Sequence, residues 1–338
     1  MAAPPASGFG MMRPIMLASA LCLPVATLPA QTHLVVVTGL GGEARYRDIF
    51  HAWALELIDA TTERYGVPVD NVIYLGESAN RDTTRIAARS TMENIERALT
   101  DLAVRAEPHA QVIVVLIGHG SARDGEPKLN LPGPDLTAVE LARLLDAFPT
   151  QTIVVANLAS ASGDFIPALS GPRRVIITAT KSGTERNQAR FGKFFVDAFA
   201  GGQADVDHDG IVSVLEAFTY ARREVARTYS QEGTLLTEHA LLDDNGDKTG
   251  SYEPGPTTTD GALARTITLG YSEAGPTARD PELAALYEKK RVIEQAIAAL
   301  QRDKGRLEAT VYEQRLEAML LDLAATNKTI RDREDGTP

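Results

Sequence analysis

The chain has 338 residues, 44% of them hydrophobic, and a formal net charge of −11. This length and apolar content suffice for one sizeable core with an appendage. The acidic balance argues against nucleic acid as a partner, because nucleic-acid-binding surfaces are basic.

The first thirty residues have the pattern of an export signal. Arg13 is the only charged residue there, residues 14–28 are apolar, and Ala30 offers a small residue for cleavage before Gln31. We expect residues 1–30 to be a signal peptide and the protein to be exported, to a bacterial periplasm or the extracellular space. A membrane anchor is the weaker interpretation, since the apolar run is short and holds two prolines. No stable membrane span is therefore expected after cleavage.

Cys22 is the only cysteine, and it lies inside the expected signal. The mature chain would then contain no disulfide and no cysteine nucleophile.

Short apolar runs alternate with helical periodicity up to residue 200. Strands are predicted at 33–37, 72–75, 112–119, 153–156 and 174–180, with a short one at 128–131. Helices are predicted at 50–65, after capping boxes at 90–93 and 137–140, and at 191–200. Unbroken β-branched runs are typical of strands buried on both faces. The alternation predicts a three-layer α/β domain with a mostly parallel sheet, which we place at residues 31–251.

Two further segments follow this domain. Residues 252–279 are rich in Pro, Gly and Thr, which predicts a linker, with an edge strand at 263–269 as an alternative for part of it. Residues 280–333 begin with Asp280-Pro281 and continue with heptad-spaced apolar residues. This pattern predicts a coiled-coil-like helical hairpin whose role is packing or self-association.

The side chains that could take part in catalysis or binding follow the ends of the predicted strands. Gly118-His119-Gly120 follows one strand, Ser160 and Ser162 follow the next, and Lys181 ends another. In open α/β sheets ligands bind beyond the carboxyl ends of strands. A histidine there can act as a general base near neutral pH. The structural alternatives are a histidine bonded to a loop carbonyl and serines that cap the next helix.

These residues carry a family resemblance. The order of strand, His119-Gly120, helix, strand and Ala159-Ser160-Ala161-Ser162-Gly163 resembles the caspase/legumain-like clan of cysteine peptidases over about residues 32–247. The legumain branch reads Ala-Cys-x-Ser-Gly at the second site, so serine replaces the nucleophilic cysteine here. Tyr46-Arg47 also resembles the legumain Tyr-Arg pair, whose arginine lines the specificity pocket.

The resemblance implies a caspase-like fold and a role for each matched residue. His119 would be the base, and Ser160 would occupy the position of the nucleophile. The N–H groups of Gly120 and Ser160 would form an oxyanion hole. Arg47, Ser162 and Lys181 would contact a polypeptide substrate, and Lys181 is an alternative base.

The cysteine-to-serine departure leaves two interpretations. A hydroxyl needs a well-aligned base to match the nucleophilicity of a thiolate. We favour a pseudopeptidase, in which the fold and groove persist for polypeptide binding or scaffolding. The alternative is an active serine-type hydrolase that uses Ser160 and His119.

Residues 205–216 have the spacing of an EF-hand calcium loop. Oxygen ligands are expected from the side chains of Asp205, Asp207, Asp209, Ser213 and Glu216 and from the carbonyl of Ile211, with glycine at the sixth position. The sequence therefore predicts a structural Ca²⁺, with an acidic capping turn as the alternative. The nearby acidic run 243–247 lacks the glycine and final glutamate, which predicts a solvated turn.

Gly39-Leu-Gly41-Gly-Glu-Ala44 nominally fits a dinucleotide fingerprint, with Asp59 near the ribose-binding spacing. A dinucleotide-binding protein is the remote third interpretation.

Overall fold

The computed structural model describes residues 31–334 except 124, 186–188, 208, 256–257, 271–280, 303 and 305–306. The predicted signal peptide therefore lies outside the described residues, as does the end of the predicted linker. Among the helices described, none is both long and apolar enough to cross a membrane.

The elements alternate along the chain as the sequence predicts. The strands are β1 (Thr32–Thr38), β2 (Val72–Gly76), β3 (Ala88–Arg89), β4 (Gln111–Ile117), β5 (Gly120–Arg123), β6 (Glu126–Leu129), β7 (Leu136–Thr137), β8 (Thr152–Asn157), β9 (Arg174–Thr178) and β10 (Leu241–Asp243). The α-helices are α1 (Ala44–Asp59), α2 (Met92–Arg105), α3 (Ala138–Leu145), α4 (Ile166–Leu169), α5 (Phe191–Gly201), α6 (Val214–Gln231), α7 (Pro281–Arg302) and α8 (Ala309–Glu334).

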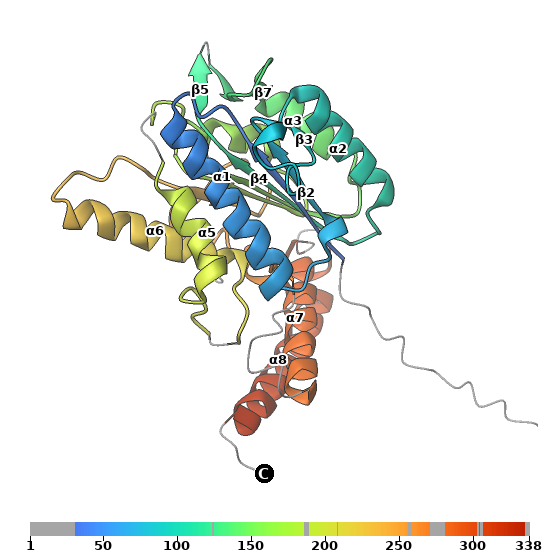
Figure 1. Cartoon of the computed structure of the whole chain (residues 1–338). Helices are drawn as coiled ribbons and strands as arrows, with labels where there is room; N and C mark the ends of the chain where they lie inside the picture. The colour runs from blue at the N-terminus through green and yellow to red at the C-terminus, as the bar shows by residue number, and fades with distance from the viewer. Residues whose placement is uncertain are drawn as a thin grey trace, which may run out of the picture.

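In the described part of the chain, seven strands form one sheet in the order β10-β9-β8-β4-β1-β2-β3. All neighbours in it run parallel except β10 and β9. Because parallel neighbours need crossover helices, those helices cover both faces of the sheet. A small antiparallel sheet, β5-β6-β7, extends beyond the carboxyl end of β4 (Figure 1).

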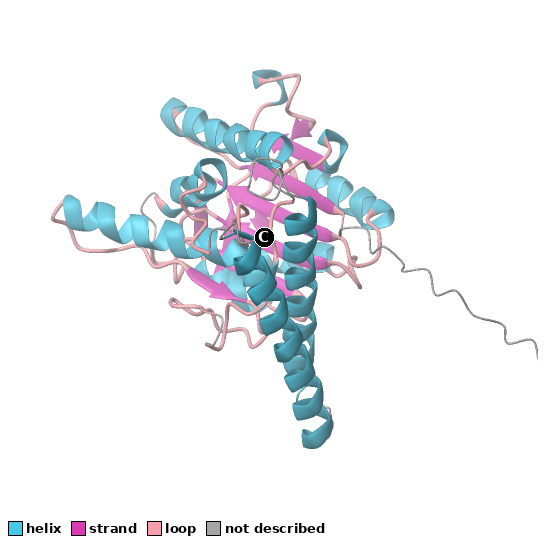
Figure 2. Ribbon diagram, turned by 90° about the horizontal axis from the view of Figure 1, so that it is seen from below, coloured by secondary structure: helices cyan, strands magenta, loops and turns pink. Residues whose placement is uncertain are grey.

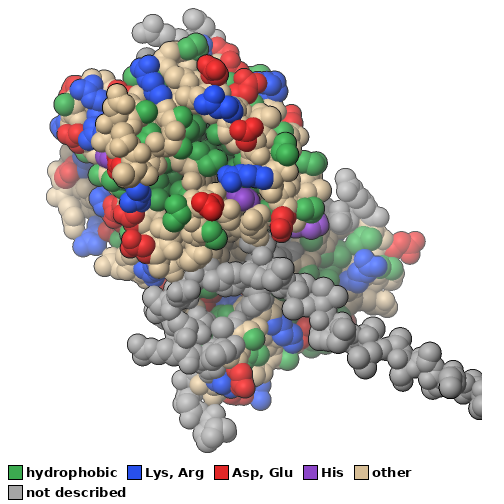
Figure 3. All heavy atoms as spheres, turned by 45° about the vertical axis from the view of Figure 1, so that its right-hand side comes forward, with side chains coloured by type: hydrophobic (Ala, Val, Ile, Leu, Met, Phe, Trp, Pro, Cys, Tyr) green, Lys and Arg blue, Asp and Glu red, His purple; other side chains and the backbone are tan. Residues whose placement is uncertain are grey.

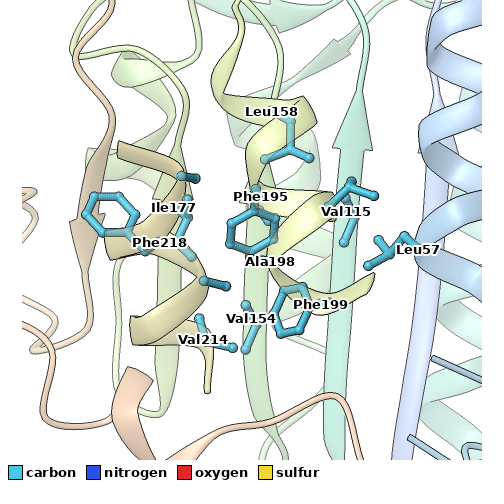
Figure 4. Packing of buried hydrophobic residues seen from close by; sticks show 14 of the residues in the cluster. Leu57, Val115, Val154, Leu158, Ile177, Phe195, Ala198, Phe199, Val214 and Phe218 are labelled. Atoms are coloured by element: carbon cyan, nitrogen blue, oxygen red, sulfur yellow. The ribbon is translucent and has the colours of Figure 1, made fainter. Parts of the chain in front are cut away.

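Alternate side chains of each central strand enter two separate cores. On β4, Val115 packs with α1 and α5, whereas Leu116 packs with α2 and α3 on the other face. Figure 4 shows the first of these cores, where Phe195 and Phe199 of α5 lie against the strands. The chain is thus a three-layer α/β fold, and the predicted fold class is confirmed.

The C-terminal helices α7 and α8 form an antiparallel hairpin that projects from the edge opposite β5 (Figures 1 and 2). Leu283, Tyr287 and Ile330 form its apolar contact. Lys289 pairs with Asp322 at 2.7 Å across the two helices. The sequence-predicted hairpin is therefore present.

Residues 258–270, which fall inside the predicted linker, pack on the sheet domain. Ala264 and Ile267 belong to the core that contains α5 and α6. Residues 264–266 form a 3₁₀ helix, and Thr268 makes a single bridge with Ser213, so no edge strand forms at 263–269.

Asp244 holds this segment in place. Its carboxylate accepts hydrogen bonds from the N–H groups of Gly261, Leu263 and Ala264 at 2.8–2.9 Å, and its side chain is 4% exposed. The predicted solvated turn at 243–247 is therefore wrong for Asp243 and Asp244, which are both buried. The backbone partners of Asp244 lie 17 to 20 residues away in sequence, so no local pattern predicts its burial.

We expect Asp244→Ala to lower the free energy of unfolding by about 3 kcal/mol, because it leaves three buried N–H groups without an acceptor. Urea denaturation at neutral pH measures the change. Asp247→Ala removes an exposed carboxylate from the same loop and serves as the control. Equal stability of the two variants would contradict the structural role of Asp244.

Candidate active site

The carboxyl ends of β4 and β8 carry the groups that the sequence singles out. The two strands are parallel neighbours, with Leu116 opposite Asn157. His119 and Ser160 each lie three residues beyond these partners. The N–H of Gly120 donates to the Ser160 hydroxyl at 3.3 Å, so the two strand ends meet at one edge of the sheet.

The His119 ring lies in an aromatic setting. Its centroid is 4.8 Å from that of Tyr46 and 5.1 Å from that of Phe50, edge to face in both cases. Burial lowers the pKa of His119, while a hydrogen bond to the Gly41 backbone and the charge of Glu43 oppose that shift. The lowered pKa favours the neutral imidazole, the form that a general base requires.

Ser160 is turned into the protein. It is 3% exposed, and its hydroxyl accepts the N–H that the family resemblance assigns to an oxyanion hole. Within the described residues no hydrogen bond joins the His119 ring to this hydroxyl. The next residue, Ala161, has φ 55°, a left-handed conformation that costs about 1–2 kcal/mol outside glycine. The turn therefore stores strain, as functional turns often do.

Ser162 and Thr180 join this turn to the end of β9. The N–H of Ser162 donates to the Thr180 hydroxyl at 2.8 Å, and Ser162 is 1% exposed. A Cβ on Gly163 would lie 2.1 Å from the Lys181 carbonyl carbon. Ser162 therefore braces the turn from inside rather than facing a groove.

Lys181 points away from the pair. Its ammonium lies 3.8 Å from a Glu185 oxygen, and its side chain is 55% exposed. Glu185 also bonds the His239 ring at 2.6 Å, and its carbonyl accepts the Ala161 N–H at 2.9 Å. Sequence reasoning missed Glu185 and His239, because no motif links two residues 54 positions apart.

Arg47 lies in the first turn of α1, where it donates to the Gly42 carbonyl at 3.1 Å. It lines a cavity of about 390 Å³ over the carboxyl ends of β1 and β2. Since β1 separates β2 from β4, this cavity is on the opposite side of His119 from Ser160.

The predicted calcium loop joins α5 to α6. Carboxylate oxygens of Asp205, Asp207 and Asp209 all lie within 4.8 Å of one another, and Gly210 has φ +85°. Burial, and then the charge of Asp207, raises the pKa of Asp209 to about 7. A divalent cation among these oxygens would offset that repulsion.

The remaining predicted ligands lie beside this cluster. Ser213 and Glu216 cap α6 reciprocally, and the other Glu216 oxygen accepts the Val206 N–H at 2.9 Å. The Ile211 N–H donates to Asp209 at 2.9 Å, which turns the loop toward α6. Lys290 of α7 reaches Asp207 at 3.0 Å. The donor set suits a cation, although Ser213 and Glu216 already have partners.

The dinucleotide interpretation finds no support in the contacts of Asp59. Its carboxylate pairs with Arg85, so it is not a free ribose acceptor.

We expect Gly120→Ala to destabilise the protein by about 2–3 kcal/mol, because its Cβ would lie 2.2 Å from the Ser160 carbonyl oxygen. Thermal or urea unfolding measures this. Gly201→Ala is the control, since its Cβ meets no atom within 4 Å. A wild-type unfolding curve for Gly120→Ala would show that the strand ends are further apart.

No family model matches the chain, and no curated protein does. Among solved structures, the chain is similar to the crystal structure of protein GSU0716 from Geobacter sulfurreducens, at a TM-score of 0.43 and 13% identity. The match covers 72% of this chain and 100% of that one. We draw no conclusion about function from it.

Proposed function

We propose that the protein is an exported, catalytically inactive homologue of the caspase/legumain-like peptidases that binds polypeptide at the edge carrying Arg47, His119 and Ser160. The observation that carries this proposal is the state of the Ser160 hydroxyl. It is buried, it accepts a hydrogen bond from Gly120, and in the described residues it makes none with His119.

This arrangement opposes nucleophilic attack in two ways. A serine needs a base within hydrogen-bond reach to remove its proton. It also needs free N–H donors for the oxyanion, and here the hydroxyl itself occupies the Gly120 donor. A site with serine in place of the thiol could therefore still bind a polypeptide, but its groups are poorly arranged to cleave that polypeptide.

An active serine-type hydrolase is the second candidate. Two observations favour it: the neutral His119 imidazole and the strained φ of Ala161 directly after Ser160. A rotation of the Ser160 side chain toward His119 would be required, and bound substrate would have to drive it.

A fluorophosphonate probe separates the two candidates. We expect no labelling of the folded protein above the level of Ser160→Ala, since the hydroxyl is neither activated nor exposed. Gel fluorescence or intact mass measures the adduct, with a known serine hydrolase in the same mixture as positive control. Labelling that disappears in Ser160→Ala and persists in Ser182→Ala would establish the enzyme instead.

We also propose that Ca²⁺ binds the loop 205–216, with Asp205, Asp207 and Asp209 as its anchoring ligands. The loop follows α5, so it lies at the edge of the sheet away from His119 (Figure 1). Its role is then structural, because it fixes the α5–α6 pair. The hairpin, which touches this loop through Lys290, is proposed to serve packing or self-association.

Calcium at a hundredfold excess over its dissociation constant is expected to raise the melting temperature by about 5 °C. Asp205→Ala should abolish this shift, and Asp247→Ala should retain it. Differential scanning fluorimetry with CaCl₂, against MgCl₂ and EDTA, makes the measurement. A chain that melts at the same temperature in CaCl₂ and EDTA has no such site.

A further inference from the structure

The hairpin of α7 and α8 carries no net charge, although the chain as a whole is acidic. Residues 281–302 hold three acidic and four basic side chains, and residues 309–334 hold five acidic and four basic ones. The two helices therefore sum to zero, whereas the whole chain has a net charge of −11. Figure 3 shows one side of the molecule, where Lys and Arg side chains are interspersed with Asp and Glu. Two copies of the chain would repel each other least where their hairpins meet.

The middle of α8 is apolar around its whole circumference. Residues 318–325 read Ala-Met-Leu-Leu-Asp-Leu-Ala-Ala, in which Asp322 is the only polar side chain. Eight residues make more than two helical turns, so these apolar side chains point in every direction from the helix axis. A helix that is apolar on all sides is normally covered on all sides.

One side of this helix packs against α7. Ile330 of α8 contacts Leu283 and Tyr287 of α7. The side chains on this side of α8 recur at heptad spacing and are buried or half-buried: Tyr312, Leu316, Met319, Leu323, Thr326 and Ile330. The partner helix within the hairpin therefore covers one apolar seam of α8.

The opposite side of α8 is uncovered. Leu321 is 65% exposed. Val311, Ala318 and Ala325 are exposed on the same side, at the three- and four-residue intervals of a second seam or their sum. Among the described residues nine large apolar side chains are exposed, and the hairpin, much the smaller part of the chain, holds four of them: Val292, Val311, Leu320 and Leu321. Apolar exposure is thus concentrated on the hairpin.

The exposed side of α8 is complementary in shape to a copy of itself. In an antiparallel pair of α8 helices, a two-fold axis between Ala318 and Leu321 would set each Leu321 against the Ala318 of the other copy. A large side chain would then fill the space beside a small one, which is how closely approaching helices pack.

The same axis would pair opposite charges. Arg315 and Asp322 are seven residues apart, so they lie on one flank of the exposed side. In the antiparallel pair, Arg315 of each copy would face Asp322 of the other. Lys289 donates to Oδ1 of Asp322 at 2.7 Å. Within the described residues Oδ2 accepts no further hydrogen bond and Arg315 makes no ion pair, so both groups can take a partner from a second copy.

We propose that the exposed side of α8 is the interface of a homodimer, in which α8 pairs antiparallel with α8 of a second copy and the two hairpins form a four-helix bundle. This inference rests on the self-association proposed for the hairpin, and it names the surface and the partner. An anionic lipid surface or a nucleic acid would instead require a basic face, which a hairpin of zero net charge does not offer.

Sedimentation velocity of the full chain over a concentration series tests the dimer. The wild type is expected to pass from monomer to dimer as the concentration rises. Leu321→Glu should weaken the dimer about tenfold or more, because each copy would place a carboxylate in the apolar interface. Val104→Glu, at an 87% exposed position on α2, is the control and should dimerise as the wild type does.

Two charge-reversed variants test the antiparallel pairing. Arg315→Asp would set acidic groups against each other across the axis. Asp322→Arg combined with Lys289→Glu would set basic groups against each other and still keep an ion pair inside the hairpin. Each variant alone should stay monomeric at concentrations where the wild type dimerises, and their equimolar mixture should form a heterodimer, since both pairs are then opposite in sign. Wild-type melting temperatures show that the variants are folded.

The dimer is refuted by a wild type that is monomeric at every concentration, or by a dimer that withstands Leu321→Glu. A mixture of the charge-reversed variants that stays monomeric refutes the antiparallel pairing. A monomeric wild type would leave packing as the role of the hairpin. Fluorophosphonate labelling of Ser160 does not depend on the exposed side of α8, so it tests the inactive-peptidase proposal separately.

Discussion

The candidate site depends on the close approach of three strand-end turns through their backbones. Gly120, after β4, leaves no room for a side chain against the Ser160 carbonyl, and Gly163 leaves none against the Lys181 peptide. Between these contacts the β8 turn is held so tightly that Ala161 adopts a left-handed φ. Packed backbones of this kind have little room to shift, since protein interiors contain few voids. The orientation of the Ser160 hydroxyl is thus a consequence of how the strand ends pack.

Most of the fold follows from patterns that are visible in the sequence. The β-branched runs of β1, β4 and β8 have no polar alternation, because helices cover both faces, and this predicted a parallel sheet correctly. The small sheet β5-β6-β7 was anticipated only at 128–131, since its strands are short and only Leu129 and Leu136 in them enter the core. Residues 258–270 read as a loop by composition, yet Ala264 is fully buried. A buried carboxylate, Asp244, makes that possible, and a long-range contact of this type has no local signature.

The site was predictable in position but not in detail. Strand-end placement followed from His119 and Ser160 each standing after a buried run. The surroundings of these two residues could not be predicted from the sequence. The orientation of the Ser160 hydroxyl, the Glu185–His239 pair and the Gly41–Glu77 hydrogen bond all depend on contacts between segments that are distant in sequence. Of the residues expected to contact substrate, Arg47 lines a cavity, Ser162 braces the turn, and Lys181 pairs with Glu185. Residue type and spacing in the sequence thus predicted which edge of the sheet carries the site. The contacts of each side chain in the fold determine what that side chain can do there.

The proposed function requires that binding of a polypeptide be separable from cleavage chemistry. Under the proposed function, transition-state stabilisation would depend on Ser160, His119 and the Gly120 N–H, whereas binding of a chain would also use the part of the edge across β1 that carries Arg47. Replacing the nucleophile removes interactions that exist only during bond breaking, and leaves the uniform binding energy unchanged. Phe50 connects the two parts, since it lines the cavity and its ring lies 5.1 Å from that of His119. Under the proposed function, a polypeptide held at this edge would therefore stay intact.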